Sequence, residues 1–367
     1  MTTTRAAVIS DAGGPIVLED IHLDRPRSGE VRVRILATGV CRSDLSIHAG
    51  VIPHAMPVVV GHEAVGEVLE LGADVDLVKE GDRVIISWIP QCGACTRCLS
   101  GHPQLCELSF MPLRGKQLDG SVRRRRADGS PLFAMGAVGA FAEEAVVPQQ
   151  SLVPITTELP ATTVALIGCA VLTGVGAALN TATIRPGDSV VVIGAGGVGL
   201  NIVQGARIAD AGTIVAVDAD AGRLEVANRL GATHLAPPDA ARATVKEVTG
   251  AGADHVFEAV GKPVTARLAF DLGRTGGTTV VVGMAALADV FEVPMFQLVS
   301  QERRILGSWY GSSDIRRDVP RMIGFAEDGV LELDGLVTST CGLEGLSEAL
   351  GTLESAKALR TVVIPGD

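Results

Sequence analysis

Short apolar runs separated by turn residues occupy the first 165 residues and predict β-strands. Residues 30–35 alternate between polar and apolar positions with a period of two, and residues 64–71 and 83–86 are further runs of β-forming residues. We therefore expect an irregular, mostly β domain in this part of the chain.

From about residue 170 the pattern changes to strands and helices in alternation. Continuous apolar runs of four or five residues are typical of strands buried on both faces, and shorter runs continue the series. Helical stretches follow at residues 199–210 and 223–230. The alternation predicts a doubly wound parallel sheet. The strand-like runs are residues 189–193, 213–217, 255–257 and 278–282.

Length and charge narrow the class of protein. At about 150 residues per domain, 367 residues suggest two domains. A net charge of −11 argues against a nucleic-acid or membrane-surface binder. The longest basic run, Arg123 to Arg126, is expected to be a solvated loop, with an anion-binding patch as the alternative. The N-terminus has no signal-like apolar region and no apolar stretch is long enough to span a bilayer, so we expect a cytoplasmic protein.

Four cysteines follow a C-x2-C-x2-C-x7-C spacing and predict a metal lobe. In a reducing compartment, clustered cysteines are more often metal ligands or catalytic groups than disulfides. Four thiolates close a tetrahedral shell around Zn²⁺ and leave no open position, which favours a structural zinc. An iron–sulfur cluster, or buried or redox-active thiols, are the alternatives. The residues are Cys92, Cys95, Cys98 and Cys106.

A glycine-rich motif predicts a dinucleotide site. Residues 194–199, GAGGVG, directly follow the apolar run 189–193 and open a helix, and Asp218 ends the next run. This is the context that a G-x-G-x-x-G phosphate loop requires. Asp218 can accept hydrogen bonds from a ribose and would repel a 2′-phosphate, which favours NAD over NADP. A glycine-rich turn that binds nothing is the alternative.

With these motifs, the chain resembles the zinc-dependent medium-chain dehydrogenases of the alcohol dehydrogenase type over essentially its whole length. The resemblance rests on these motifs together with five others. Residues 119–144 resemble the longer loop of the animal and glutathione-linked formaldehyde branches. The other motifs are GHEAVGEV at 61–68, GDRV at 81–84, PQCGACTRC at 90–98, GCAVLTGVGAA at 168–178 and ALRTVV at 358–363.

The resemblance implies an α/β protein of two domains. A GroES-like, mostly β catalytic domain would comprise residues 1–169 and 309–367, with the structural zinc lobe at about 88–110. A Rossmann domain with a doubly wound parallel sheet would comprise residues 170–308. The C-terminal stretch, with a helix at 342–353 and a closing strand at 359–364, would return to the first domain.

The resemblance also implies roles for single residues. Ser43 would take the alcohol proton, Asp44 would orient a ligating histidine, and Glu63 would lie behind the metal. The catalytic zinc ligands would be Cys41, His62 and Cys169. The cofactor-binding residues would be Arg42, Thr173, Gly194, Gly196, Gly197, Val198, Gly199, Asp218, Arg223, Val260 and Arg360, with the two outermost arginines on the pyrophosphate. The substrate pocket would be lined by Ile52, Trp88, Met111, Ala285 and Trp309.

Two positions depart from the family pattern. Where many members carry a proton-relaying histidine, this chain has Ser46, and the nearby His48 is either a substitute relay or a plain loop residue. Where the formaldehyde branch carries an arginine, this chain has Phe110, which puts a glutathione adduct in doubt.

The resulting hypothesis is reversible hydride transfer between NAD and an apolar or aromatic primary or secondary alcohol, with two zinc ions per chain. A nicotinoprotein with permanently bound NAD(H), a thiol-adduct formaldehyde dehydrogenase and a zinc-free quinone reductase are alternatives. The charge and the glycine motif count against a zinc-ribbon nucleic-acid binder. We expect a homo-oligomer, with a dimer favoured over a tetramer. The seventh cysteine, Cys341, fits no motif and is expected to be a buried small apolar residue.

Overall fold

The computed structural model describes residues 1–354 and 359–366 and divides the chain into two compact units. The first unit comprises Met1–Cys169, Asp314–Gly329 and Leu333–Asp367, and the second comprises Ala170–Ser313 and Val330–Glu332. The division thus falls five residues later than the predicted return at residue 309. Ala358, which begins the motif at 358–363, and the terminal Asp367 lie outside the described residues.

The first unit contains a closed barrel with strand order β1-β2-β7-β8-β4. Its longest pair, β1 and β2, is antiparallel and in register from Thr2 opposite Leu23 to Ile9 opposite Ile16. The last four residues of β1 are fully buried and belong to an apolar core cluster that also includes Ile47 and Leu346, outside the barrel strands. The strands are β1 (Thr2–Ile9), β2 (Ile16–Leu23), β7 (Arg124–Arg125), β8 (Pro131–Ala134) and β4 (Val58–Val59).

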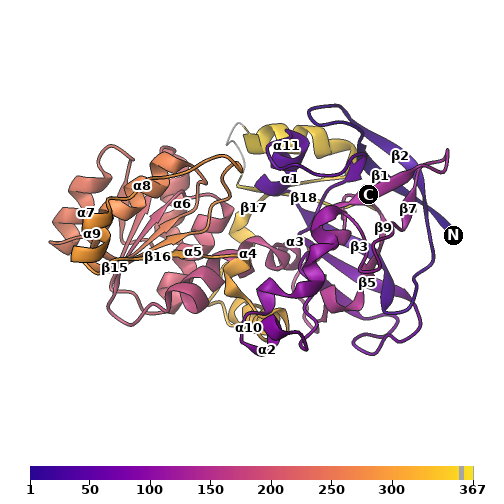
Figure 1. Cartoon of the computed structure of the whole chain (residues 1–367), viewed down its shortest axis with the longest axis horizontal. Coiled ribbons are helices and arrows are strands. Elements are labelled where there is room, and N and C mark those ends of the chain that lie inside the picture. The colour runs from indigo at the N-terminus through magenta and orange to yellow at the C-terminus, as the bar shows by residue number, and fades with distance from the viewer. Residues whose placement is uncertain (355–358, 367) are drawn as a thin grey trace. The chain divides into compact units, whose positions relative to one another are not determined.

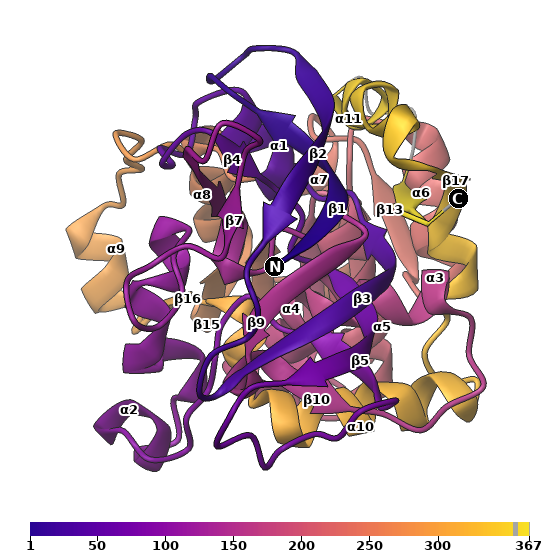
Figure 2. The same cartoon turned by 90° about the vertical axis from the view of Figure 1, so that its right-hand side faces the viewer.

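A second sheet of the first unit has the order β10-β6-β5-β3-β18-β17, and β9 also pairs with β3. Figure 2 shows β9, β3 and β5 side by side. The C-terminal strand β18 is antiparallel to β3, with Val362 opposite Gly39, so it places Arg360 near the end of β3. The strands are β10 (Leu152–Pro154), β6 (Arg83–Ile86), β5 (Ala64–Leu71), β3 (Glu30–Gly39), β18 (Arg360–Val363), β17 (Val337–Cys341) and β9 (Glu144–Pro148).

The second unit is built on a parallel sheet with the order β13-β12-β11-β14-β15-β16 (Figure 1). The order reverses between β11 and β14, so the crossover helices cover both faces, as the predicted doubly wound α/β fold requires. The strands are β11 (Ser189–Ile193), β12 (Thr213–Val217), β13 (His234–Ala236), β14 (Ala253–Glu258), β15 (Gly273–Val281) and β16 (Arg304–Gly307).

The helices of the second unit follow the strands. Helix α5 contacts β11 and β12, and α8 contacts β14 and β15. The predicted helices at 199–210 and 223–230 correspond to α5 and α6. The helices are α4 (Ala170–Gly176), α5 (Gly197–Ile208), α6 (Ala221–Arg229), α7 (Ala241–Thr249), α8 (Pro263–Leu272) and α9 (Met295–Ser300).

The helices of the first unit are mostly short. Their positions matter for the site because α1 begins directly after Cys41 and α2 directly after Cys95. Helix α10, which sequence analysis did not identify, begins at an Asp314 N-cap whose side chain accepts from the Arg316 amide, as N-caps commonly do. The helices are α1 (Arg42–His48), α2 (Thr96–Leu99), α3 (Ala161–Ala165), α10 (Ile315–Glu327) and α11 (Leu346–Glu354).

The expectation that the run from Arg123 to Arg126 is a solvated loop is wrong. Arg124 begins strand β7, and the side chains of Arg123 and Arg124 belong to residues that are only 3% exposed. Arg123 forms a 2.7 Å ion pair with Glu30. These arginines are buried because strand pairing turns them inward, where carboxylates and backbone carbonyls receive them.

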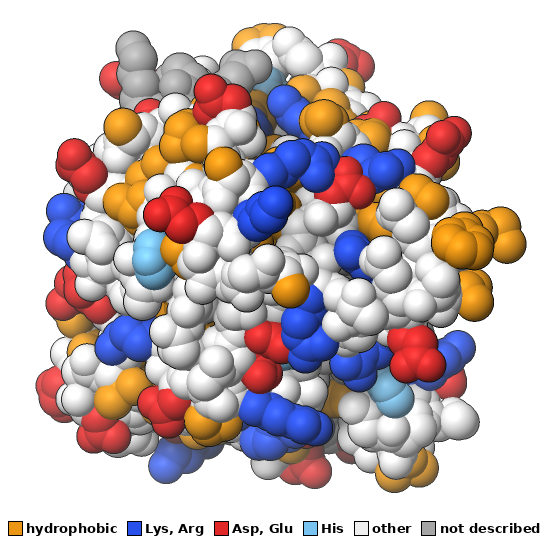
Figure 3. All heavy atoms as spheres, turned by 90° about the vertical axis from the view of Figure 1, so that its left-hand side faces the viewer, with side chains coloured by type: hydrophobic (Ala, Val, Ile, Leu, Met, Phe, Trp, Pro, Cys, Tyr) orange, Lys and Arg blue, Asp and Glu red, His pale blue; other side chains and the backbone are white. Residues whose placement is uncertain are grey.

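Figure 3 shows acidic and basic side chains interspersed over the face that it presents. Within the described residues, no single helix has both the length and the apolar composition to cross a bilayer. The bent helix pair Ala161–Gly168 and Ala170–Ala182 meets that test only when its two parts are taken together.

Candidate functional site

The four clustered cysteines bring their sulfur atoms together in the first unit. The Sγ atoms of Cys92 and Cys98 are 3.9 Å apart, those of Cys95 and Cys106 are 3.9 Å apart, and those of Cys92 and Cys106 are 3.6 Å apart. A tetrahedral zinc site with Zn–S bonds of about 2.3 Å has sulfur–sulfur edges of about 3.8 Å. The cluster therefore has the size of a zinc site, and its separations are too long for disulfides of about 2.05 Å.

Backbone amides surround these sulfurs and tune them. The Cys92 Sγ accepts from the amides of Ala94 and Cys95 at 3.4 and 3.2 Å. Hydrogen bonds from the backbone of Glu107 and Cys98 lower the pKa of Cys95 to about 6, whereas burial raises the pKa of Cys106 to about 12. A cation among the four sulfurs would favour all four thiolates, since metal ligation requires deprotonated thiols.

A second cluster joins three residues that are far apart in the sequence. One ligand atom each of Cys41, His62 and Cys169 lies within 4.8 Å of the others. Cys41 is the N-cap of α1, His62 lies between β4 and β5, and Cys169 separates the 3-10 turn Leu166–Gly168 from α4. All three are buried, with 6%, 1% and 7% exposure. Two thiols and one imidazole fit zinc and leave one tetrahedral position open.

Asp44 organises this second cluster. Its Oδ1 accepts from His62 Nδ1 at 3.0 Å and from the Gly61 amide at 2.9 Å, and its Oδ2 accepts from the Cys41 amide at 2.9 Å. With Nδ1 as donor, the Nε2 lone pair of His62 is free for a metal. Burial works against a charged imidazole, but the negative charge of Asp44, supported by Cys41, outweighs it and raises the pKa of His62 well above its usual value.

A buried ion pair lies beside the second cluster. Glu63 is fully buried, and its Oε2 is 3.3 Å from Nη1 of Arg360, which also donates to the Val40 carbonyl at 3.0 Å. Burial opposes the Arg360 charge, but Glu63 and the neighbouring Cys41 raise the pKa of Arg360 above its usual value. This pair was not predicted, because Glu63 and Arg360 lie far apart in the sequence.

The two arginines predicted for the pyrophosphate differ in setting. Arg360 is 4% exposed and engaged with Glu63, whereas Arg42 is exposed on the first turn of α1. Contact of either one with a pyrophosphate stays a prediction.

Four other predicted site residues lie on the first unit, and Trp88 among them contacts the second cluster. Ser43 is half-buried, one position before Asp44 on α1. The Trp88 ring meets the His62 ring edge-on, with centroids 6.1 Å apart and an interplanar angle of 86°. Ile52 packs on the barrel core, and Met111 is half-buried. The other two predicted pocket residues, Ala285 and Trp309, are half-buried on the second unit.

His48 is engaged in a loop contact. Its Nε2 is 2.8 Å from the carbonyl oxygen of Gly14. Ser46 is half-buried and its carbonyl accepts from the Ile52 amide. This contact holds one of the two ring nitrogens of His48 against the backbone of the loop that contains Gly14.

The glycine loop joins β11 to α5 in the second unit. Gly194 has a φ of +98°, a conformation that favours glycine, and a Cβ on Gly199 would lie 1.7 Å from the Gly194 carbonyl oxygen. A Cβ on Gly196 would meet nothing within 4 Å. The loop thus packs tightly on its inner side and leaves open space at Gly196, as a pyrophosphate cradle requires.

Asp218 lies at the end of β12 and is linked to this loop. Its Oδ2 accepts from the Ala195 amide at 2.7 Å, and its Oδ1 accepts from the Asp220 amide at 2.9 Å. The carboxylate is therefore held beside the fingerprint, where a ribose hydroxyl would be recognised.

The remaining predicted cofactor residues lie in the second unit. Gly197 and Val198 begin α5, Thr173 is on α4, and Arg223 is in the first turn of α6. Val260 follows β14, and its amide donates to Glu258 Oε1 at 2.9 Å. Most of these positions follow the carboxyl ends of parallel strands, where nucleotides bind in such sheets.

Comparison with known proteins agrees with this arrangement. Residues 27–157 match the alcohol dehydrogenase GroES-like domain, and residues 197–328 match the zinc-binding dehydrogenase domain. The chain is 38% identical to the NDMA-dependent alcohol dehydrogenase of Amycolatopsis methanolica, covering 98% of both chains. It is also 38% identical to an S-(hydroxymethyl)glutathione dehydrogenase of Escherichia coli, covering 98% of this chain and 99% of that protein.

A solved structure is similar over the full length. The crystal structure of benzyl alcohol dehydrogenase from Acinetobacter calcoaceticus has a TM-score of 0.94 with this chain at 28% sequence identity, and all of both chains is covered.

Proposed function

The chain belongs to the zinc-binding, GroES-like alcohol dehydrogenase family, and from this premise we propose that it transfers a hydride reversibly between an alcohol and NAD. The observation that carries the proposal is the buried Cys41–His62–Cys169 cluster, with Asp44 holding both Cys41 and His62. Three protein ligands leave a fourth position open, which is the mark of a catalytic zinc site.

Zinc, when bound, supplies a Lewis acid that favours loss of the alcohol proton, and NAD supplies the hydride acceptor. The chain's own residues do the rest. Asp44 fixes the His62 tautomer, and the half-buried Ser43 relays the alcohol proton, accepting it at its hydroxyl oxygen while it passes its own hydroxyl proton on to solvent. The Glu63–Arg360 pair keeps a balanced charge beside the ligands. Burial of these groups excludes water, which strengthens each electrostatic contact.

We assign the cofactor as NAD rather than NADP. The Asp218 carboxylate is held beside the glycine loop by two backbone amides, so its negative charge faces the ribose position and opposes a 2′-phosphate.

The substrate that we propose is an apolar or aromatic primary or secondary alcohol. Trp88 stands edge-on to His62, Ile52 and Met111 are apolar, and the full-length structural similarity to a benzyl alcohol dehydrogenase supports an aromatic body.

A nicotinoprotein is the second candidate, because a relative with 38% identity is named for its dependence on NDMA. Such an enzyme would hold NAD(H) through purification. A nicotinamide absorbance that stays with the protein through gel filtration would favour it, and release of all nicotinamide would favour free exchange.

A glutathione-adduct formaldehyde dehydrogenase is a third candidate, because another relative with 38% identity carries that activity in its name. Phe110 replaces the expected arginine, but the Arg114 guanidinium lies 3.6 Å from the centre of the Phe110 ring. S-(hydroxymethyl)glutathione therefore belongs in the substrate panel, with Arg114→Ala as its partner variant.

The panel itself tests the proposal. Benzyl alcohol, aliphatic primary and secondary alcohols, a polyol and S-(hydroxymethyl)glutathione are each offered with NAD⁺ and with NADP⁺. We expect turnover with NAD⁺ and the aromatic or apolar alcohols. Failure of every alcohol with either cofactor, in protein that contains zinc, would contradict the proposal.

We further propose a homodimer formed through the second unit. Large apolar side chains are exposed on and just before α9, and exposed apolar patches mark interfaces. Light scattering of Phe296→Glu should show a monomer, while Val17→Glu, on an exposed position of β2, should stay dimeric. The exposed residues are Leu287, Val290, Met295, Phe296 and Val299.

A further inference from the structure

Glu258 is a buried carboxylate that the proposed chemistry does not use. It is fully buried at the last position of β14, where the strand order of the parallel sheet reverses between β11 and β14. Nucleotides bind in such sheets at the carboxyl ends of the strands, beside this reversal. A buried carboxylate is costly unless hydrogen bonds compensate it, so the partners of Glu258 indicate what it stabilises.

One oxygen of Glu258 accepts three hydrogen bonds from the residues that follow it. Oε1 accepts from the backbone amides of Val260 and Gly261 at 2.9 and 2.8 Å, and from the hydroxyl of Thr265 at 2.7 Å. Thr265 lies in the first turn of α8. A single carboxylate oxygen therefore fixes the turn at residues 259–261 and joins it to the start of α8.

This turn packs against the first glycine of the dinucleotide motif. The Ala259 amide donates to the Ile193 carbonyl at 2.8 Å. A Cβ on Gly194 would lie 2.7 Å from Cγ2 of Val260 and 3.2 Å from the carbonyl carbon of Ala259. The turn thus contacts the residue that opens the glycine loop, so a displacement of the turn would displace the loop as well.

Glu258 also joins the turn to the strand on its other side. Its backbone carbonyl accepts from the amides of Val282 and Gly283 at 2.9 and 3.0 Å, directly after β15. A Cβ on Gly283 would lie 2.2 Å from the Gly261 amide nitrogen and 2.7 Å from Oε2 of Glu258. The carboxyl ends of β11, β14 and β15 are therefore connected through Glu258 and the turn that it holds.

We propose that Glu258 is a positioning residue for the dinucleotide. By holding the turn at residues 259–261, it keeps the Gly194 end of the glycine loop in the conformation that receives the pyrophosphate, and this inference rests on the proposed NAD-dependent function. Glu258 is fully buried, so it acts through the turn and does not itself contact the cofactor. A site that binds through backbone groups depends in this way on the residues that support its loop.

The test is calorimetric titration of the zinc-loaded protein with NAD⁺ and with ADP-ribose, which carries the adenosine and the pyrophosphate but no nicotinamide. Glu258→Met keeps the length of the side chain and leaves two amides and the Thr265 hydroxyl without their acceptor. We expect Kd for both ligands to rise about 10-fold or more. Glu258→Gln retains an acceptor oxygen and should bind both ligands within about 3-fold of wild type.

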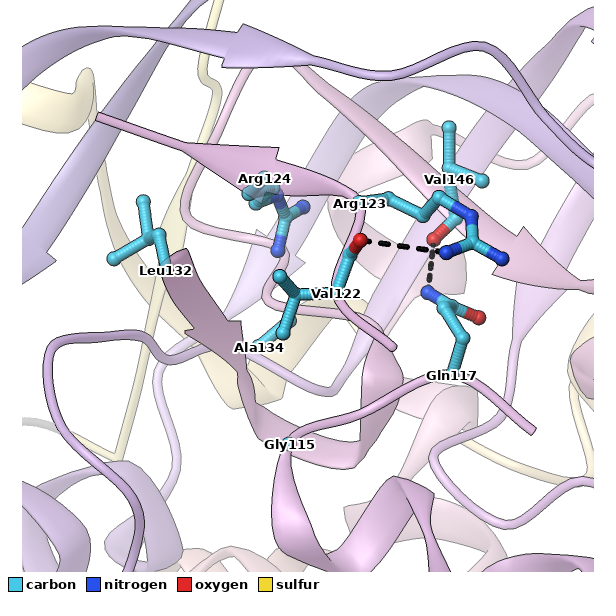
Figure 4. Close-up of a pocket in the computed structure, with 8 residues that line it drawn as sticks. All are labelled: Gly115, Gln117, Val122, Arg123, Arg124, Leu132, Ala134 and Val146. Atoms are coloured by element: carbon cyan, nitrogen blue, oxygen red, sulfur yellow. Dashed lines mark hydrogen bonds between the residues drawn. The ribbon is translucent and has the colours of Figure 1, made fainter. Parts of the chain in front are cut away.

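Two control variants separate positioning from a general loss of stability. Asp254→Ala acts near the opposite, amino end of β14, where the Asp254 carboxylate accepts from the Ser189 amide at 2.8 Å. Gln117→Leu removes the 2.8 Å hydrogen bond from Gln117 to the Val146 carbonyl in the first unit (Figure 4). Both variants should lower Tm and leave Kd for NAD⁺ and ADP-ribose unchanged.

Wild-type affinity for both ligands in Glu258→Met would overturn the proposal, and so would an equal loss of affinity in either control. An equal loss in Glu258→Gln would also overturn it, because hydrogen-bond acceptance would then not be the cause.

If Glu258→Met does not fold, Glu258→Asp takes its place, because the shorter side chain draws the carboxylate back from its three donors. Reduced affinity in Glu258→Asp supports the proposal, and unchanged affinity contradicts it. Wild-type protein that binds neither ligand would contradict the NAD-dependent function and this inference together.

Discussion

Asp44 couples two of the three residues in the candidate catalytic cluster through one carboxylate. Asp44→Asn keeps the shape of the side chain but replaces one acceptor oxygen with an NH2 donor. That donor would face either the Cys41 amide or the donors of His62 and Gly61, so at least one hydrogen bond would be lost. Loss of such a partner lowers metal affinity or activity about 10- to 100-fold. We expect kcat/KM to fall by that factor, with zinc retained in the four-cysteine lobe.

Asp11→Asn, at an exposed position, is the matched control and should leave both quantities unchanged. Wild-type kcat/KM and zinc content in Asp44→Asn would show that Asp44 does not support the metal.

His54 gives the protein a stability that depends on pH. Burial lowers its pKa below the ordinary 6.5, partly offset by a hydrogen bond with the Ala55 carbonyl. The unfolded chain therefore binds the proton more tightly, so stability is lost as pH falls through about 6.5. We expect His54→Gln to lose less Tm than wild type between about pH 7 and about pH 5. Equal losses in both proteins would refute this, and His234→Gln, at an exposed position, should behave as wild type.

Single residues could be predicted where the chemistry is local in sequence. The cysteine spacing indicated the four-sulfur lobe, and Asp218 could be placed from its distance to the glycine motif. Partners distant in sequence could not be predicted in this way. The Glu63–Arg360 pair forms because β18 pairs with β3, and Arg124 is buried because β7 closes the barrel. Both depend on tertiary pairing that no local pattern encodes.

Two glycines of the motif at residues 194–199 should differ in how their replacement by alanine affects Tm and NAD⁺ affinity. A Cβ on Gly199 would collide with the Gly194 carbonyl, so Gly199→Ala should lower both Tm and NAD⁺ affinity. A Cβ on Gly196 meets no protein atom, so Gly196→Ala should leave Tm nearly unchanged and weaken NAD⁺ binding about 10-fold or more, a loss of about 1.4 kcal/mol. Calorimetric titration with NAD⁺ and thermal unfolding measure the two effects.

Gly324→Ala on α10 is the control, because a Cβ there also meets nothing and alanine favours a helix. Its NAD⁺ affinity should equal that of wild type. Unchanged NAD⁺ affinity in Gly196→Ala would remove the loop from the cofactor site.

Elements with a strong intrinsic pattern were predictable. The buried strands of the parallel sheet are continuous apolar runs, and the predicted run 189–193 has the bounds of β11. Helix α10 is amphipathic but contains Pro320, which weakens a helical pattern in the sequence. The basic run at 123–126 was misjudged because four arginines indicate solvent exposure, whereas paired carboxylates and carbonyls compensate burial of the first two.

At the scale of the molecule, the chain leaves its first unit at Cys169 and returns to it at Asp314. This division lets β18, at the C-terminal end, complete the sheet that carries Arg360 beside Glu63. The predicted discontinuity followed from the resemblance and not from the pattern, because the last 60 residues carry no signal for which unit they join.

The central claim is that a metal held by Cys41, His62 and Cys169 is required for alcohol oxidation. The most direct measurement is NAD⁺-dependent turnover of an aromatic alcohol by Cys41→Ala, with Cys341→Ala as a control that alters the cysteine outside both clusters. We predict background turnover in Cys41→Ala and wild-type turnover in Cys341→Ala, with lobe zinc retained in both. Wild-type turnover by Cys41→Ala would show that this cluster does not hold the catalytic metal.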